Sequence, residues 1–303
     1  MLHSSVFSRL ACCRFVAVPH CAALLRSLLA LCSVLSLLVA PIMSSSTAAS
    51  DSGSGPHLTL YFDPISQPSR AVLMFLRETG LAHEVRSVSL EKREQFAPQF
   101  LAINPLHRIP TIVEAATHSG SHKASASGVE SDSPDFVLDE SMTIMRYLVS
   151  SRPSVPRHWF PSSPRLQARV NQYLDWHHIN FRRPAGITVF MSLFRERAGA
   201  TEEKARSVIA ELAQPLRDAL GHIESRLQIQ DWIATVEDIS IADLSCATEV
   251  AQLSMILYDL SPYPRLSAWY DRVRQRVKSF DDVHQTVTMN RERVAKGELK
   301  KLE

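Results

Sequence analysis

The spacing of apolar residues changes once along this chain, and the change divides the predicted fold into two parts. In residues 57–152, stretches that alternate apolar and polar residues, as half-buried strands do, are interleaved with stretches of helical spacing. From residue 165 to residue 303 the spacing is helical throughout. Residues 153–164 contain four prolines among serines, which is typical of a linker. The sequence therefore predicts an α/β domain followed by an all-helical domain.

The first domain is predicted to be a mixed sheet with helices in the order β-α-β-α-β-β-α, a thioredoxin-like arrangement. The strands are expected at 57–62, 84–90, 109–113 and 136–138, and the later helices at 96–101 and 141–148. The first helix has Pro68 in its first turn and ends at Gly80. Residues 115–135 are rich in Ser, Gly and Ala where a tight hairpin would suffice, and we expect a solvated spacer there.

The second domain is predicted to be a helical bundle. Helices are expected over 166–181, over 187–194 after a kink or stop at Pro184-Ala185-Gly186, over 205–227 and over 266–277, with a polar, helix-prone tail from Asp282. Another helix is predicted to begin at Ser240, because Asp243 follows at the spacing of a capping box. That helix is apolar on most faces, so we interpret it as the buried central helix, with a purely structural role.

Residues 1–55 are set apart as a leader or disordered arm. They contain no acidic residue before Asp51, and their apolar run over 27–40 has signal-peptide length but is short for a membrane-spanning helix. A signal peptide, an organelle transit peptide and a start of translation at Met43 are all compatible with this composition. We favour the last, and therefore a cytoplasmic protein, because the single cysteine of the body, Cys246, has no disulfide partner there.

Charge and composition exclude several classes of function. The net charge of +2 gives no indication of affinity for nucleic acid or anionic membranes. Membrane association is expected only if the leader is retained. The cysteines and histidines have no zinc-ligand spacing, so no metal site is predicted.

Ser66 follows the first strand and opens the first helix. The turn of a thioredoxin-like fold often contains C-x-x-C, but here both positions are serine, Ser66 and Ser69, which excludes dithiol redox chemistry. A hydroxyl at this place can donate a hydrogen bond to a thiolate that a ligand brings in. The alternative is that Ser66 only caps the helix.

Two other short motifs are compatible with binding a peptide. A cis bond between Ile109 and Pro110 would turn the Ile109 backbone outward for pairing with an extended ligand, whereas a trans proline at a strand start is the more common arrangement. A helix that begins at Glu140-Ser141 would offer free N–H groups and a hydroxyl to a carboxylate, and the Glu140 side chain could take an ammonium. The alternative is a plain N-cap at Asp139 or Ser141.

Together these motifs resemble the glutathione transferase family, and in particular its theta class. The resemblance extends from Leu58 to about Phe280 and depends on "LYFDPISQPSRAV", "INPLHRIPTI", "LDESMTIMRYL", "WHHINFRR" and "ISIADL" in this order. It implies a thioredoxin-like domain followed by a helical domain, glutathione as the co-substrate, and a homodimer.

The resemblance also implies a role for individual residues. Ser66 would hydrogen-bond the sulfur of glutathione, Arg182 would lie near that sulfur, Ile109 would precede a cis Pro110, Arg108 would contact the glycyl end, and Glu140-Ser141 would bind the γ-glutamyl group. Gln95 stands where the family often has a histidine near the glycyl carboxylate, which implies altered or weaker binding. Phe190, Met191 and Phe194 are candidates for the acceptor pocket, although an apolar helix face is more often core.

The leading hypothesis is an enzyme that conjugates glutathione to small hydrophobic electrophiles or reduces organic hydroperoxides. The alternative is a non-catalytic dimerisation or scaffold module of the same fold. Retention of Ser66, Glu140 and Ser141 together favours catalysis.

Overall fold

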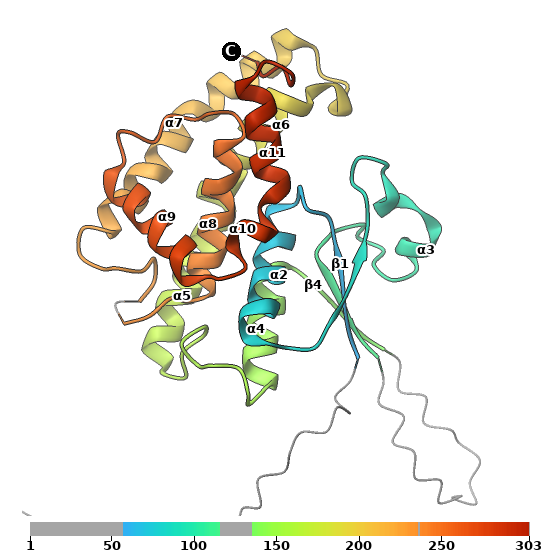
Figure 1. Ribbon diagram of the computed structural model, residues 1–303, viewed down its shortest axis with the longest axis vertical. Coiled ribbons are helices and arrows are strands. Elements are labelled where there is room, and N and C mark those ends of the chain that lie inside the picture. The colour runs from blue at the N-terminus through green and yellow to red at the C-terminus, as the bar shows by residue number, and fades with distance from the viewer. Residues whose placement is uncertain (1–56, 116–134, 236, 303) are drawn as a thin grey trace, which may run out of the picture. The chain divides into compact units, whose positions relative to one another are not determined.

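The N-terminal part of the protein is built on a four-stranded mixed sheet (Figure 1). The computed structural model describes residues 57–115, 135–235 and 237–302. The strands are β1 (Leu58–Phe62), β2 (Glu84–Ser87), β3 (Thr111–Glu114) and β4 (Phe136–Asp139), in the spatial order β2-β1-β3-β4. Strand β1 runs parallel to β2 and antiparallel to β3, and β3 runs antiparallel to β4. Most of the predicted 115–135 spacer and the whole leader lie outside the described residues.

Helices cover both faces of this sheet. They are α2 (Gln67–Thr79), the short η2 (Glu94–Phe96) and α3 (Pro98–Leu101), and α4 (Ser141–Ser151). Helices α2 and α4 lie against one face, while α3 lies on the other, where Phe100 packs on Tyr61 (Figure 1). The order of strands and helices confirms the predicted thioredoxin-like arrangement.

Several boundaries differ from the prediction for physical reasons. Strand β2 ends at Ser87, before the predicted residue 90, because the Leu90 amide donates 2.8 Å to the Asp63 carboxylate instead of joining the ladder. Strand β3 begins at Thr111, after the predicted residue 109. Strand β1 is buried on both faces rather than one, because the chain segment that contains Phe100 covers its second face.

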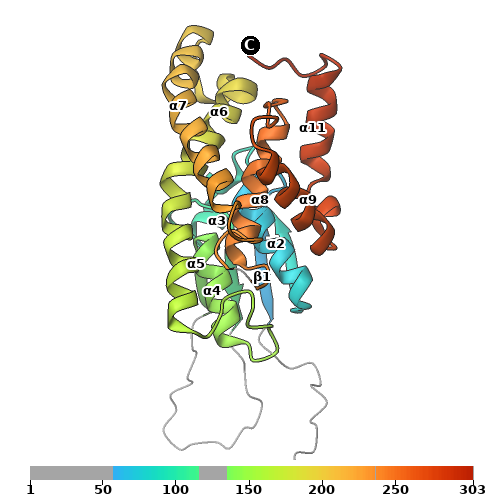
Figure 2. The same ribbon diagram turned by 90° about the vertical axis from the view of Figure 1, so that its left-hand side faces the viewer.

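The C-terminal part is all-helical, as predicted (Figure 2). Its helices are α5 (Pro164–His177), η3 (His178–Arg182), α6 (Arg183–Phe194), η4 (Arg195–Ala198), α7 (Glu202–Arg226), α8 (Ile241–Ser254), α9 (Pro264–Arg276), α10 (Phe280–Val283) and α11 (Gln285–Ala295). Every residue of α8 up to Leu253 is buried, and α8 packs against α2, α4, α5, α6, α9 and α11. The prediction of a buried central helix is confirmed.

The break between α5 and α6 lies earlier than predicted. Pro184-Ala185-Gly186 is inside α6, and the irregularity is the π-helical turn η3 just before it. Pro184 has no N–H to donate, and a wider turn N-terminal to it removes the need for one. The wide turn also contains Arg182, one of the predicted site residues.

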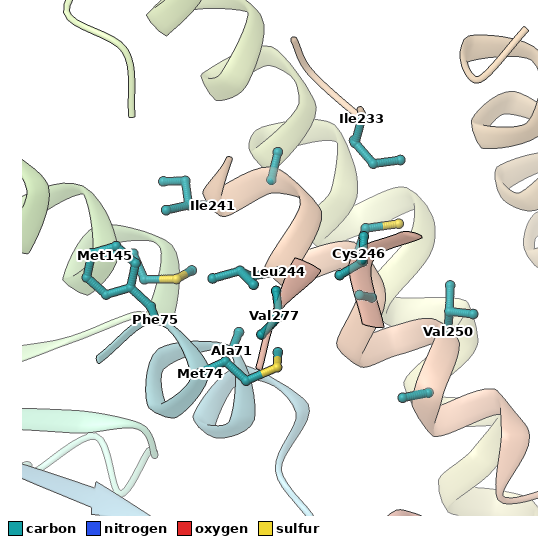
Figure 3. Packing of buried hydrophobic residues seen from close by; sticks show 14 of the residues in the cluster. Ala71, Met74, Phe75, Met145, Ile233, Ile241, Leu244, Cys246, Val250 and Val277 are labelled. Carbon is teal, nitrogen blue, oxygen red and sulfur yellow. The ribbon is translucent and has the colours of Figure 1, made fainter. Parts of the chain in front are cut away.

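The segment between α4 and α5 contributes to the hydrophobic core. Trp159 is buried, its ring meets that of Phe75 edge-on at 5.9 Å, and its carbonyl accepts 2.9 Å from the Ile241 amide. Residues of α2, α4 and α8 pack in one continuous cluster, shown from close by in Figure 3, where Phe75, Met145 and Leu244 are labelled. This shared core fixes the position of α2 relative to α8.

Candidate active site

Two adjoining cavities open between the turn after β1 and the helices η3 and α6. The larger has a volume of about 660 Å³ and the smaller about 450 Å³. Of the residues predicted from the sequence, Ser66 and Gln95 line the larger cavity, Pro110, Glu140 and Ser141 line the smaller, and Arg108, Ile109 and Arg182 line both. The structure therefore brings all of these residues to one place.

Ser66 lines the larger cavity and also caps α2. Its Oγ accepts 3.4 Å from the Ser69 amide and 2.9 Å from the Ser69 hydroxyl. With Ser69 as donor in both contacts, the proton of the Ser66 hydroxyl is left for another acceptor. The two roles that the sequence left open are compatible here, because the cap uses the lone pairs of Ser66 and not its proton.

The peptide bond between Ile109 and Pro110 is cis. The loop before it is organised by Asn104, a buried residue that the sequence analysis did not single out. Its amide nitrogen donates 3.1 Å to the Arg108 carbonyl and 3.0 Å to the Thr111 hydroxyl, and its oxygen accepts 2.9 Å from the Leu106 amide. Asn104 thus holds Arg108 and Ile109 at the wall that the two cavities share.

Glu140 and Ser141 line the smaller cavity at the start of α4. The expected alternative of a cap at Asp139 or Ser141 is wrong: Glu140 occupies the N-cap position and makes no side-chain cap bond. Its φ of 63° is uncommon for a residue other than glycine, and such conformations cluster at functional sites. The first amides of α4 therefore have no capping side chain.

Arg182 is paired with a carboxylate that the sequence analysis missed. Its Nε lies 3.4 Å from Oε1 of Glu249, which is only 1% exposed, inside α8. Burial raises the pKa of Glu249 to about 7, and the positive charges of Arg182 and Arg70, together with the side-chain amide of Gln67, oppose that rise. A charged residue inside an otherwise apolar helix was the available signal, and the structural interpretation of that helix passed over it.

Arg70 ties the turn that contains Ser66 to α8. It is fully buried, and its guanidinium donates 2.7 Å to the Pro64 carbonyl, 2.6 Å to Oε1 of Gln252 and 3.3 Å to the Thr248 carbonyl. Burial lowers its pKa to about 10. Gln252 also lines the larger cavity, so α8 contributes directly to the site and is not only structural.

One wall of the larger cavity is apolar. Phe190 and Phe194 of α6 line it, with ring centres 6.2 Å apart. Met191, predicted to lie with them, is not among the lining residues, because residues four apart share a face of a helix and their neighbours do not. Arg197 lies over the Phe194 ring at 4.7 Å and donates 2.9 Å to Glu91, another residue that the sequence did not single out.

Two further features are absent from the described residues. They contain no group of three or more His, Cys, Asp or Glu side chains that could hold a metal ion. None of the helices over these residues combines the length and the apolar character that crossing a bilayer requires.

Comparison with known proteins identifies both halves of the chain. Residues 65–151 match the family model for the glutathione S-transferase N-terminal domain, and residues 184–276 match the model for the C-terminal domain. Glutathione S-transferase T1 of Arabidopsis thaliana is 31% identical over 236 residues, which is 75% of this chain and 88% of the plant protein.

Two solved structures agree with this. Human glutathione transferase theta-2, in complex with glutathione and an unknown ligand, has a TM-score of 0.66 and 29% identity, and the match covers 80% of this chain and 92% of the human one. A human theta-class enzyme, in complex with the glutathione conjugate of 1-menaphthyl sulfate, has a TM-score of 0.65 and 30% identity over the same shares of the two chains.

Proposed function

This chain belongs to the glutathione S-transferase family, and on that premise we propose that it conjugates the thiolate of glutathione to small hydrophobic electrophiles. The observation that carries the proposal is the Ser66 hydroxyl, which faces the larger cavity with its proton unused. It lies in the same cavity as a cation, Arg182, and an apolar wall. The hydroxyl and the cation can stabilise a thiolate, and the apolar wall can bind a hydrophobic acceptor.

The smaller cavity is suited to the γ-glutamyl end of glutathione. The uncapped amides of α4 and the Ser141 hydroxyl can donate to the α-carboxylate, and the Glu140 carboxylate can accept from the ammonium. Ile109 lines both cavities, so its backbone groups are the ones that would pair with the peptide between its two ends. Arg108 and Gln95 are then left for the glycyl carboxylate in the larger cavity.

The chemical step requires the bound thiol to lose its proton. A free thiol has a pKa near ~8.5, and lowering that by about two units corresponds to roughly 2.7 kcal/mol of preferential stabilisation of the thiolate. A hydrogen bond from Ser66 and the charge of Arg182 together are of the size required. The thiolate then forms the carbon–sulfur bond while the leaving group departs with the electron pair of the broken bond.

Reduction of an organic hydroperoxide is a second use of the same thiolate. The sulfur would attack the terminal peroxide oxygen, an alcohol would leave, and a second glutathione would reduce the sulfenate to a disulfide and water. The apolar wall favours aromatic acceptors, which accords with the glutathione conjugate of 1-menaphthyl sulfate in the structure of the human relative. Turnover of an arylmethyl halide and of cumene hydroperoxide would rank the two activities.

Ser66→Ala tests the proposal. We expect kcat/KM for an arylmethyl halide to fall about 10- to 100-fold, because one charge-assisted hydrogen bond to the thiolate is lost. Binding to immobilised glutathione should persist, and Ser66→Thr, which keeps a hydroxyl, should recover part of the rate. Ser163→Ala, at an N-cap that makes no side-chain bond, is the matched control. Full activity in Ser66→Ala would overturn the mechanism, and failure of the wild type to bind glutathione would favour the scaffold alternative.

We also propose a homodimer. Two apolar side chains are largely exposed: Leu106, which lines the smaller cavity, at 62%, and Ile179, next in sequence to the lining residue His178, at 65%. A second copy of the chain would cover them. Sedimentation analysis of the purified protein tests this, and a monomer at micromolar concentration would contradict it. A cytoplasmic location stays a proposal as well, and sequencing the N-terminus of the natural protein would decide it.

A further inference from the structure

Glu249 lies behind the site without lining it. The residue is 1% exposed and belongs to neither cavity lining, yet its Oε1 is 3.4 Å from the Nε of Arg182, which lines both cavities. Its Oε2 has no hydrogen-bond partner among the described residues. Leaving an oxygen of a buried carboxylate unpaired is costly, so this arrangement calls for an explanation beyond packing.

The charged and polar groups that face Glu249 come from several elements. Arg182 comes from η3, Arg70 and the amide of Gln67 come from α2, and the thiol of Cys246 lies on α8 itself. Around Arg70, the elements beyond α8 add Tyr270, from α9, and His284, between α10 and α11. The only cation within ion-pair distance of Glu249 in the described part of the chain is therefore Arg182.

We propose that Glu249 is a positioning residue for the transferase reaction, whose carboxylate holds the guanidinium of Arg182 by Nε so that the two Nη groups face the bound sulfur and its acceptor. This inference rests on the proposed function. A guanidinium is a rigid planar fork, so engaging Nε fixes the directions of both Nη groups. Those groups have no hydrogen-bond partner within the described residues, which leaves them for a ligand.

The pair is also sensitive to pH. Because burial raises the pKa of Glu249 to about 7, the carboxylate is largely ionised at pH 8 and largely protonated below pH 6. Protonation removes the charge that holds Arg182. The activity of the wild type should therefore fall on acidification more steeply than ionisation of the thiol alone requires, since two groups lose their charge over the same range.

Glu249→Gln removes the charge and keeps the shape. At pH 8 and saturating glutathione, we expect kcat/KM for an arylmethyl halide to fall roughly tenfold, a coupling of about 1.4 kcal/mol. The ratio of wild type to variant should approach one below pH 6. In an Arg182→Met background the same substitution should change the rate less than twofold. An equal loss in both backgrounds, or a ratio independent of pH, would show that Glu249 acts only through packing and would overturn the inference.

Glu114→Gln is the matched control, because Glu114 is another buried carboxylate paired with an arginine, Arg152, away from both cavities. It should leave the pH profile unchanged. A readout without turnover separates this inference from the proposed function: NMR of ¹³C-labelled glutamate carboxyls should show a titration near neutral pH. That titration should vanish in Glu249→Gln and move to higher pH in Arg182→Met. Its absence from the wild type would overturn the inference even if the enzyme is active, while its presence in an inactive protein would refute only the proposed function.

Discussion

Asp243 and Glu249 are both buried carboxylic acids on α8, and they are supplied with partners very differently. One oxygen of Asp243 accepts 2.8 Å from the Ile233 amide and 3.0 Å from the Trp269 indole. The other accepts 2.9 Å from the Ser240 amide and 3.0 Å from the Ser240 hydroxyl. Glu249 has one ion pair at 3.4 Å and an oxygen with no hydrogen-bond partner among the described residues.

Burial raises the pKa of both groups, but hydrogen bonds from backbone and side chains oppose the rise at Asp243 much more fully. A buried polar group whose partners are all in place makes the local structure rigid. A buried charge with too few partners stays responsive to protons and to ligands. The two ends of this one helix therefore have different roles: the first turn stabilises the fold, and the later turns support the cavities.

The largest expected effect is the loss of folding stability when the Asp243 carboxylate is removed. Asp243→Ala leaves the amides of Ile233 and Ser240 and the indole N–H of Trp269 without an acceptor. Each buried unpaired donor costs about 1–3 kcal/mol, so we expect the free energy of unfolding to fall by about 3–5 kcal/mol. Denaturant unfolding at pH 7.5 measures this. A loss below about 1 kcal/mol would mean that the hydrogen-bond network of Asp243 does not stabilise the fold, and would contradict the contrast drawn between Asp243 and Glu249.

That network is the part of α8 that the sequence could predict. Ser240 and Asp243 are three residues apart, and the geometry of a helix start brings them together whatever the rest of the chain does. The same holds for the cap at Ser66 and the stop at Gly80, both of which the structure confirms. Local chemistry also explains why the order of strands and helices in the first domain was predictable.

The rest of the site depends on residues that are distant in sequence. Glu249 meets Arg182 only because α5 and α6, the helices on either side of η3, pack against α8. The charge of Arg70 acts on Glu249 only because α2 packs on α8. No local pattern marks such a contact. The family resemblance pointed to Arg182 but not to its partner Glu249. The break before α6 was placed too late in the sequence, because Pro184 is tolerated in the first turn of a helix.

The second prediction concerns how ionisation of Glu249 lowers the free energy of unfolding as the pH rises to neutral. The pKa of Glu249 in the folded state is about 7, above its ordinary value of 4.5, so its contribution to stability is complete below pH 4.5 and is lost as the pH rises through 7. Glu249→Gln lacks this loss. Between pH 5 and pH 8 the variant should gain stability relative to the wild type, by up to about 3 kcal/mol.

Thermal or denaturant unfolding across that pH range measures the difference. The matched Glu114→Gln protein should show no such relative gain, since Glu114 is paired both with Arg152 and with the hydroxyl of Tyr147 at 2.7 Å. A constant difference between Glu249→Gln and the wild type from pH 5 to pH 8 would contradict the contrast between the two carboxylates.

A third and smaller effect measures how much one hydrogen-bond donor to Asp243, the indole of Trp269, contributes to stability. Trp269→Phe removes the indole donor but leaves the Ile233 amide on the same Asp243 oxygen. We expect a loss of about 2 kcal/mol, from one hydrogen bond and the small cavity that replaces part of a fully buried indole. Transferase activity at 25 °C should be unchanged, because Trp269 lines neither cavity of the site. A drop in kcat/KM without a drop in stability would show that the two ends of α8 are coupled.

The smallest expected effect separates stability from activity at two glycines. In the interior of a helix, Gly→Ala stabilises by about 0.5–1 kcal/mol. At Gly221 of α7 an added Cβ meets nothing within 4 Å, but at Gly186 of α6 it lies 3.4 Å from Nε2 of Gln67, the amide that faces Glu249. Both substitutions should raise the free energy of unfolding, and Gly186→Ala alone should lower kcat/KM, by about twofold to threefold. If the two variants are equally active, the Gln67 amide does not influence the ionisation of Glu249. The effect of Glu249 on activity would then depend on its ion pair with Arg182 alone.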